Sequence, residues 1–134
     1  MAAVSMASPP GTDGGEPTAA APWARATRLG VLADLDGLAA SFCGFNIKLV
    51  KCGGITPGLR MARRGLQKGL RTMVGCMLES SVLIAAGAVV AQQTDYADLD
   101  GAWLLADDPF TGWRFENGVL HPPAAPGLGA RPVE

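Results

Sequence analysis

The sequence predicts an α/β fold built on a parallel sheet, and three observations carry that prediction. Apolar segments typical of strands begin near residues 45, 70 and 96, at nearly equal spacing. A segment with helical periodicity separates each pair, and this strand–helix–strand order is typical of parallel sheets with right-handed crossovers. The repeat stops near residue 102, where a Pro/Gly-rich tail begins, so we expect the last part of a larger fold.

Residues 1–29 differ in composition from the rest of the chain. They are rich in Ala, Pro, Gly, Ser and Thr and contain almost no larger aliphatic residues. Such a segment buries too little apolar surface to offset the entropy lost on ordering, so we expect it to be disordered. The folded domain is then expected over residues 30–134, which is enough for one modest core.

The first βα unit is expected in the order helix, strand, helix. Helical spacing over residues 31–42 predicts a helix with Gly44 as its C-terminal cap. The apolar stretch "FNIKLV" at 45–50 predicts the first strand. Thr56 is the expected N-cap of the next helix, with Pro57 at its first position. Its expected inner face and its stop are Leu59, Ala62, Leu66 and Gly69.

The next two strands and their connecting helix follow the same order. Residues 70–77 predict the second strand, and residues 96–101 predict the third. Residues 79–93 predict a helix that is apolar nearly all round and should therefore be well covered. In the tail, Asn117-Gly118 is a strong two-residue hairpin signal.

Composition and charge exclude several classes of protein. The formal net charge of −1 gives no electrostatic basis for binding nucleic acid or an anionic membrane. The longest apolar run, at 81–91, is shorter than the roughly 20 residues that a membrane span needs. Three widely spaced cysteines fit neither a disulfide framework nor a zinc site, so we expect buried thiols in the reducing cytoplasm.

Ionisable and polar side chains recur where the predicted strands end. In parallel β/α folds, ligands bind at the carboxyl ends of the strands. The first strand places Lys48 there, among apolar neighbours that disfavour its charged form, so it could act as a general acid or base near neutral pH. The other two strand ends offer Cys76, Met77, Glu79, Asp98 and Asp100.

Each of these residues also has a structural interpretation. Lys48 could extend its ammonium group to solvent or pair with an acid. Asp98 and Asp100 could cap the following loop, although residues i and i+2 of a strand share one face and could hold a single cation together. Glu79 could be favoured at a helix N-terminus by the helix dipole. The combination of residues on three successive strand ends favours a functional site.

Three motifs, "NIKLVKCGGITPGLRMA", "MVGCMLESS" and "DLDGAWLLADDPF…PGLG", are similar to the C-terminal part of enolase superfamily proteins. Within that superfamily the chain resembles the muconate cycloisomerase-like subgroup, and within it the dipeptide epimerases such as L-Ala-D/L-Glu epimerases. The resemblance runs from about residue 31 to 131. It implies an incomplete enolase-type (β/α) barrel that comprises three βα units.

The resemblance implies a role for most of the residues at the strand ends. Lys48 corresponds to the second of two acid/base lysines that exchange the α-proton of a dipeptide. Asp98 and Asp100 correspond to an Asp-x-Asp pair that holds the substrate ammonium group, and Glu79 to a polar residue near the site. Cys76 and Met77 are expected to contact substrate. The cofactor that the family implies is Mg²⁺.

The sequence also departs from the family pattern. It contains no Lys-x-Lys pair, and "PWARATRLG" stands where a metal-binding strand is expected, so we expect the Mg²⁺ ligands to be absent. Asp34 and Asp36 fall in a predicted helix and do not replace them. We therefore expect a truncated dipeptide epimerase-like protein that is inactive alone.

Two other interpretations stay open at the level of sequence. One is a non-enzymatic half-barrel that associates with a missing N-terminal portion or with itself. The other is a muconate cycloisomerase or o-succinylbenzoate synthase, whose substrates carry no ammonium group for Asp98 and Asp100 to hold.

Overall fold

The computed structural model describes residues 4–5, 23–24, 35–38 and 42–134. Four parallel strands form its main sheet, in the order β2-β3-β4-β5. Three of them follow one another along the chain and across the sheet, as the strand–helix–strand pattern predicts. The strands are β2 (Trp23–Ala24), β3 (Gly44–Ile47), β4 (Arg71–Gly75) and β5 (Tyr96–Asp98).

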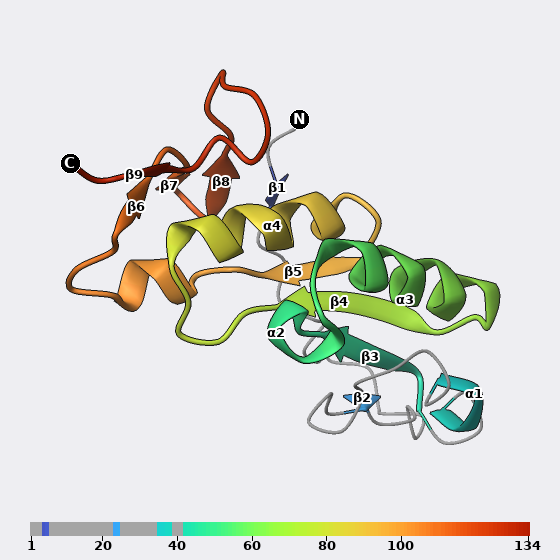
Figure 1. The fold of residues 1–134 in the computed structure, drawn as a ribbon. Coiled ribbons are helices and arrows are strands. Elements are labelled where there is room, and N and C mark those ends of the chain that lie inside the picture. Colours follow the sequence, from blue (N-terminus) through green and yellow to red (C-terminus); the bar gives the residue numbers. More distant parts are fainter. Residues whose placement is uncertain (1–3, 6–22, 25–34, 39–41) are drawn as a thin grey trace.

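Two long helices cover one face of this sheet. Helix α3 (Ile55–Gln67) connects β3 to β4, and α4 (Ser81–Ala91) connects β4 to β5. Both lie on the same side of the strands in Figure 1. Two single-turn helices, α1 (Leu35–Leu38) and α2 (Leu49–Cys52), precede and follow β3. Across the described residues, no helix is long and apolar enough to cross a membrane.

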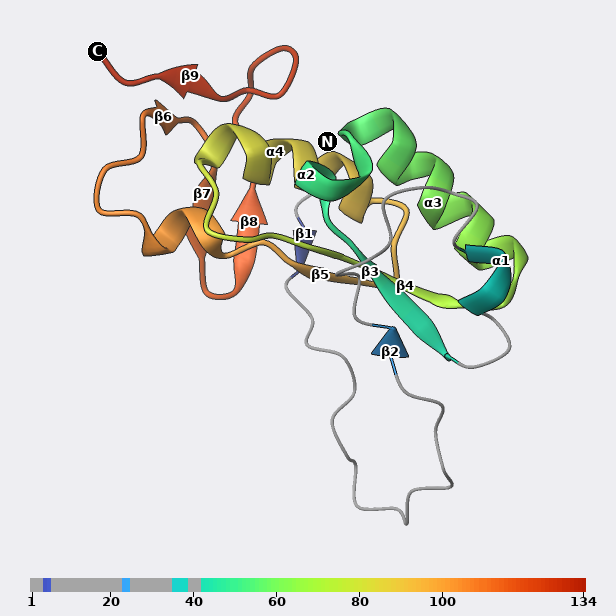
Figure 2. The same cartoon turned by 60° about the horizontal axis from the view of Figure 1, so that its bottom comes forward.

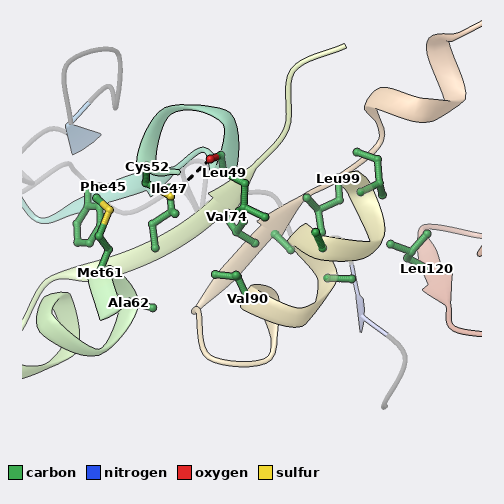
Figure 3. Packing of buried hydrophobic residues seen from close by; sticks show 14 of the residues in the cluster. Phe45, Ile47, Leu49, Cys52, Met61, Ala62, Val74, Val90, Leu99 and Leu120 are labelled. Atoms are coloured by element: carbon green, nitrogen blue, oxygen red, sulfur yellow. Dashed lines mark hydrogen bonds between the residues drawn. The ribbon is translucent and has the colours of Figure 1, made fainter. Parts of the chain in front are cut away.

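The core lies between the sheet and the two long helices. Phe45, Ile47 and Val74 of the sheet are at most 1 % exposed, as are Met61 of α3 and Val90 of α4 (Figure 3). Side chains alternate between the faces of a strand. Because Phe45 and Ile47 contact the helices, the residues between and after them point to the opposite face of the sheet.

Helix α3 begins earlier and is rotated relative to the sequence prediction. Its N-cap is Gly54 rather than Thr56, and Leu66, expected on the inner face, is 75 % exposed. The buried face of α3 consists of Gly58, Met61, Ala62 and Gly65, so Ala62 is buried as expected. A Cβ at Gly65 would approach Phe45 to 2.6 Å. Helix α3 can approach the sheet this closely only where it presents glycine, and this close contact determines which face of the helix is buried. Gly69 ends the helix as expected, with a φ of 71°.

The chain around β3 corrects two further expectations. Gly44 is the first residue of β3, not a helix cap, and it pairs with Arg71 of β4. A side chain at Gly44 would collide with the Arg71 backbone, so the strand pairing itself requires glycine here. The strand also ends sooner than expected, and residues 49–52 form α2.

The chain after β5 forms small antiparallel sheets at the carboxyl end of the strands, next to α4 (Figure 1 and Figure 2). The predicted hairpin is confirmed: Asn117 and Gly118, with φ of 51° and 76°, join β7 to β8. The elements of this tail are η2 (Gly101–Leu104), β6 (Phe110–Thr111), β7 (Arg114–Glu116), β8 (Val119–His121) and β9 (Arg131–Pro132).

Two short stretches of the N-terminal segment have strand structure. β1 (Val4–Ser5) pairs antiparallel with β8, and Trp23–Ala24 of β2 pairs with β3. The sequence predicted no secondary structure at these four residues. The rest of the segment lies outside the described residues, as do residues 31–34 and 39–41 of the predicted first helix.

Candidate functional site

Lys48 lies at the carboxyl end of β3, immediately before α2. Its backbone is extended, with φ of −118° and ψ of 118°, so it continues the alternation of the strand. Its side chain is half-buried and reaches across to β4, where Nζ donates a hydrogen bond to the carbonyl oxygen of Cys76 at 2.5 Å. The ammonium group is therefore held at the ends of two neighbouring strands.

Three further predicted residues meet beside this lysine. Ligand atoms of Cys76, Asp98 and Asp100 all lie within 4.8 Å of one another. The Cys76 thiol contacts Asp100 Oδ1 at 3.7 Å and accepts a hydrogen bond from the Gly101 N–H at 3.2 Å. The turn after β5 thus folds back over the end of β4 and gathers side chains from both strands.

The electrostatics of this cluster are those of crowded acidic groups. Burial and the charge of Asp100 raise the pKa of Asp98, while Lys48 acts in the opposite direction. Burial, partly opposed by the Gly101 N–H, raises the pKa of the Cys76 thiol, and Asp98 and Asp100 add to the rise. A cation bound between the carboxylates would relieve the repulsion, so the site favours a positively charged group.

Met77 and Glu79 lie next to the cluster in different ways. The Met77 side chain is 50 % exposed, and its backbone packs so closely on Gly101 that only glycine fits there. Glu79 is half-buried, and its Oε1 has no hydrogen-bond partner. The charge of Glu79 acts on Cys76, so this carboxylate belongs to the same acidic surroundings. Substrate contacts by either residue stay predictions.

Asn46 is a polar residue of this face that the sequence prediction missed. It precedes Lys48 by two positions, so both side chains point away from the helices. Its Oδ1 is buried without a hydrogen-bond partner, and its amide fills the space where a Cβ of Gly75 would stand. A polar residue two positions before Lys48 in an apolar strand was the available signal.

The cluster of Cys76, Asp98 and Asp100 is a poor match for a magnesium site. Mg²⁺ prefers oxygen ligands in a near-octahedral arrangement, whereas this cluster offers one thiol and two carboxylates beside a lysine ammonium. Asp36 lies in α1, as expected, and Asp34 lies outside the described residues. The arrangement suits an organic ammonium group better than a hard divalent ion.

Comparison with protein families identifies the fold. Residues 36–134 match the model of the enolase C-terminal domain-like family. The chain belongs to this family. Its site therefore lies on part of an enolase-type (β/α) fold, with Lys48 at one strand end and the two aspartates at another.

Two curated relatives have dipeptide epimerase names. An L-Ala-D/L-amino acid epimerase from Flavobacterium johnsoniae is 57 % identical over 79 residues, which are 59 % of this chain and 24 % of the relative. A hydrophobic dipeptide epimerase from Roseobacter litoralis is 54 % identical over 86 residues, which are 64 % and 25 % of the two chains. The chain thus spans about a quarter of the length of these relatives.

A solved structure supports the same relation. A dipeptide epimerase from Methylococcus capsulatus, complexed with Mg and the dipeptide L-Arg-D-Lys, superposes with a TM-score of 0.74 at 40 % identity. The match covers 81 % of this chain and 32 % of that one. The fold is shared over the described βα units, and about two thirds of that chain lies outside the match.

Proposed function

We propose that this chain carries one part of a dipeptide epimerase active site. Lys48 would exchange the α-proton on one face of the substrate, and Asp98 and Asp100 would hold its ammonium group. The observation that carries the proposal is the convergence of these side chains at the carboxyl ends of β3, β4 and β5. The relatives' names support a dipeptide as the substrate class.

The chemistry assigned to Lys48 follows from its position. As a neutral amine it would accept the α-proton, breaking the C–H bond and forming an N–H bond, while the electron pair moves into the adjacent carbonyl. The hydrogen bond to the Cys76 carbonyl holds Nζ at the strand ends, which restricts the approach to one face. Return of the proton to the other face requires a second group on that face, which Lys48 cannot supply.

The proposal is tested by supplying the remainder of a barrel. Residues 36–134, grafted in place of the matching segment of the Flavobacterium johnsoniae relative, should give a chimera that epimerises an L-Ala dipeptide. Lys48→Ala in that chimera should lower kcat by about 10²–10⁴-fold, the usual contribution of a general acid or base. The matched control is Lys51→Ala, an exposed lysine of α2, which should leave kcat unchanged.

Two outcomes would contradict the proposal. A folded chimera without activity would contradict the proposal as a whole. A chimera in which Lys48→Ala is as active as the parent would exclude Lys48 as a proton-transfer group. The purified chain by itself should show no epimerisation, because a single proton-transfer group cannot serve both faces. Clear Mg²⁺-dependent epimerisation of L-Ala-L-Glu by that material would refute this expectation.

One observation supports the hypothesis that this chain associates with a partner chain. Among the described strands β5 pairs only with β4, so the outer edge of β5 is open, as a strand awaiting a neighbour would be. Size-exclusion chromatography with circular dichroism, on the chain alone and co-expressed with the first part of a relative, distinguishes the cases. Cooperative unfolding only in the mixture would support a partner chain, and an isolated monomer that unfolds cooperatively would oppose it.

A further inference from the structure

Asn46 places a carboxamide in the middle of an apolar strand. Its neighbours Phe45 and Ile47 belong to the core beneath the helices and are at most 1 % exposed, so Asn46 points to the opposite face of the sheet. Lys48, two positions later, shares this face. The Asn46 Oδ1 atom is buried and has no hydrogen-bond partner. Buried acceptors are nearly always paired, so this oxygen indicates a donor that the described residues do not supply.

The carboxamide lies over Gly75 of the neighbouring strand. A Cβ at Gly75 would stand 2.6 Å from Asn46 Nδ2 and 2.7 Å from Oδ1, so only glycine leaves room for the amide. Asn46 pairs in register with Met73, two residues before Gly75, and its side chain therefore leans toward the carboxyl ends of the strands. Gly75 pairs in turn with Asp98, which follows the buried Ala97 and so shares the face of Asn46. The unpaired oxygen thus lies on the strand beside Asp98.

A ligand at the neighbouring cluster can supply the missing donor. Lys48 shares the face, but its ammonium group is directed to the Cys76 carbonyl oxygen. A primary ammonium group carries three N–H donors, whereas Asp98 and Asp100 provide two carboxylates. We infer that Asn46 Oδ1 accepts the third N–H of the ammonium group that Asp98 and Asp100 hold. This deepens the proposed function and rests on its assignment of the ammonium site.

A neutral acceptor suits this position better than a third acid. The charge of Asp100 already raises the pKa of Asp98, and a further carboxylate would raise it more. The Asn46 oxygen accepts a hydrogen bond without adding charge. The site is then selective for an unsubstituted ammonium group, because an N-methyl group would replace one N–H and leave Oδ1 buried and unpaired.

Methylation of the ligand nitrogen tests this selectivity by removing one donor. The probes are L-alanine amide and N-methyl-L-alanine amide, which both carry a positive charge at neutral pH. Titration of the ¹⁵N-labelled full chain, followed by NMR, gives the two affinities. We expect the methylated probe to bind about tenfold more weakly, as the loss of one hydrogen bond to a charged group implies.

Variants of Asn46 assign the selectivity to its oxygen. Asn46→Leu, an apolar side chain of similar size, should weaken binding of L-alanine amide about tenfold and make the two probes bind alike. Asn46→Asp keeps an acceptor oxygen and should retain the tenfold ratio. Thr72→Val is the matched control, since Thr72 is buried against Gly65 on the helix side of the neighbouring strand and should not alter the ratio. Circular dichroism checks that each variant folds.

The side-chain amide signals of the unaltered chain give a second test that needs no folded variant. L-Alanine amide should shift the Asn46 side-chain NH₂ signal, because its carboxamide contacts the ligand. Asn117, the other asparagine of the chain, lies in the hairpin between β7 and β8, and its signal should stay in place.

The outcomes distinguish this inference from the proposal on which it rests. Equal affinity of the two probes for the unaltered chain, with weaker binding of both to Asp98→Asn, would overturn the role of Asn46 and keep the ammonium site. A tenfold ratio that persists in Asn46→Leu would assign the ratio to steric exclusion and overturn the hydrogen bond. Binding that leaves the Asn46 amide signal in place would overturn it as well. No binding of either probe would overturn both assignments.

Discussion

The two ends of the main sheet carry the same residue types in opposite states. At the amino-terminal end, Asp95 accepts hydrogen bonds from Arg71 at 2.7 Å and from the backbone N–H and hydroxyl of Thr72 at 2.8 and 3.1 Å. At the carboxyl end, Asp98 faces Asp100, a thiol and a lysine that is bound to a carbonyl. One aspartate is fully paired, and the other is three residues away and crowded.

The pKa values of these aspartates move in opposite directions. Burial would raise the pKa of Asp95, but the Thr72 and Arg71 hydrogen bonds outweigh burial and hold it below the ordinary value. Burial and Asp100 raise the pKa of Asp98. Matched pairing is typical of a group that stabilises the fold, and unmatched charge is typical of a group that binds something else. We therefore expect the sheet to separate a stabilising aspartate from a binding aspartate along its strands.

The largest effect should come from removing the paired aspartate. Asp95→Ala leaves the backbone N–H of the buried Thr72 without a partner, so we expect the free energy of unfolding to fall by about 1–3 kcal/mol. Urea unfolding followed by circular dichroism measures it. Asp98→Ala is the matched control and should change stability by less than about 0.5 kcal/mol. Equal losses in the two variants would contradict the separation of roles.

The reverse comparison concerns binding. Asp98→Asn should weaken binding of L-alanine amide to the chain by about tenfold, because a charge-assisted hydrogen bond becomes a neutral one. Asp95→Asn should leave that affinity unchanged, since Asp95 lies at the other end of the strands. Calorimetric titration of both variants at one ionic strength makes the comparison. A loss of affinity at Asp95 alone would place the ammonium site elsewhere.

The smallest effects are those of pH. A depressed folded pKa means that the Asp95 contribution to stability is present above the unfolded pKa and is lost as pH falls through the folded value. The raised pKa of Asp98 acts in reverse, favouring the folded state below the unfolded pKa and losing that contribution as pH rises through the folded value. The affinity for an ammonium group should increase as pH rises through the folded pKa of Asp98. The increase should be less than about tenfold per pH unit, because binding releases at most one proton.

Urea midpoints measured from acidic to neutral pH test the predicted loss of stability at low pH. Titrations with an ammonium ligand over the same pH range test the predicted gain of affinity. Asp95→Asn should reduce the loss of stability that occurs at acidic pH. Part of that loss should remain, because hydrogen bonds from Ser81 and Phe110 outweigh burial and lower the pKa of Asp108 as well. Affinity that falls as pH rises would be incompatible with carboxylates as the binding groups.

The fold and the position of most candidate site residues were open to prediction because they depend on local patterns. Lys48, Asp98 and Asp100 were placed by strand alternation and by the rule that strand ends bind ligands, and the structure brings them together. The rotation of α3 was not predictable from periodicity, because Gly65 packs against Phe45 twenty residues earlier and Leu66 is turned outward. Asn46 was also missed, because its contact with Gly75 joins two strands that are separate in the sequence.

The outer edge of β5, which no other described strand covers, has a consequence for handling the protein in solution. Exposed strand edges promote aggregation, and short length and charged side chains are two features that oppose it. β5 has three residues and ends in Asp98, which is exposed, so its edge combines both features. Because the pKa of Asp98 is raised, this carboxylate loses its charge at a higher pH than an ordinary aspartate does. Concentrated samples should therefore precipitate more readily as the pH falls through the pKa of Asp98, and a buffer above that pH should keep them dispersed.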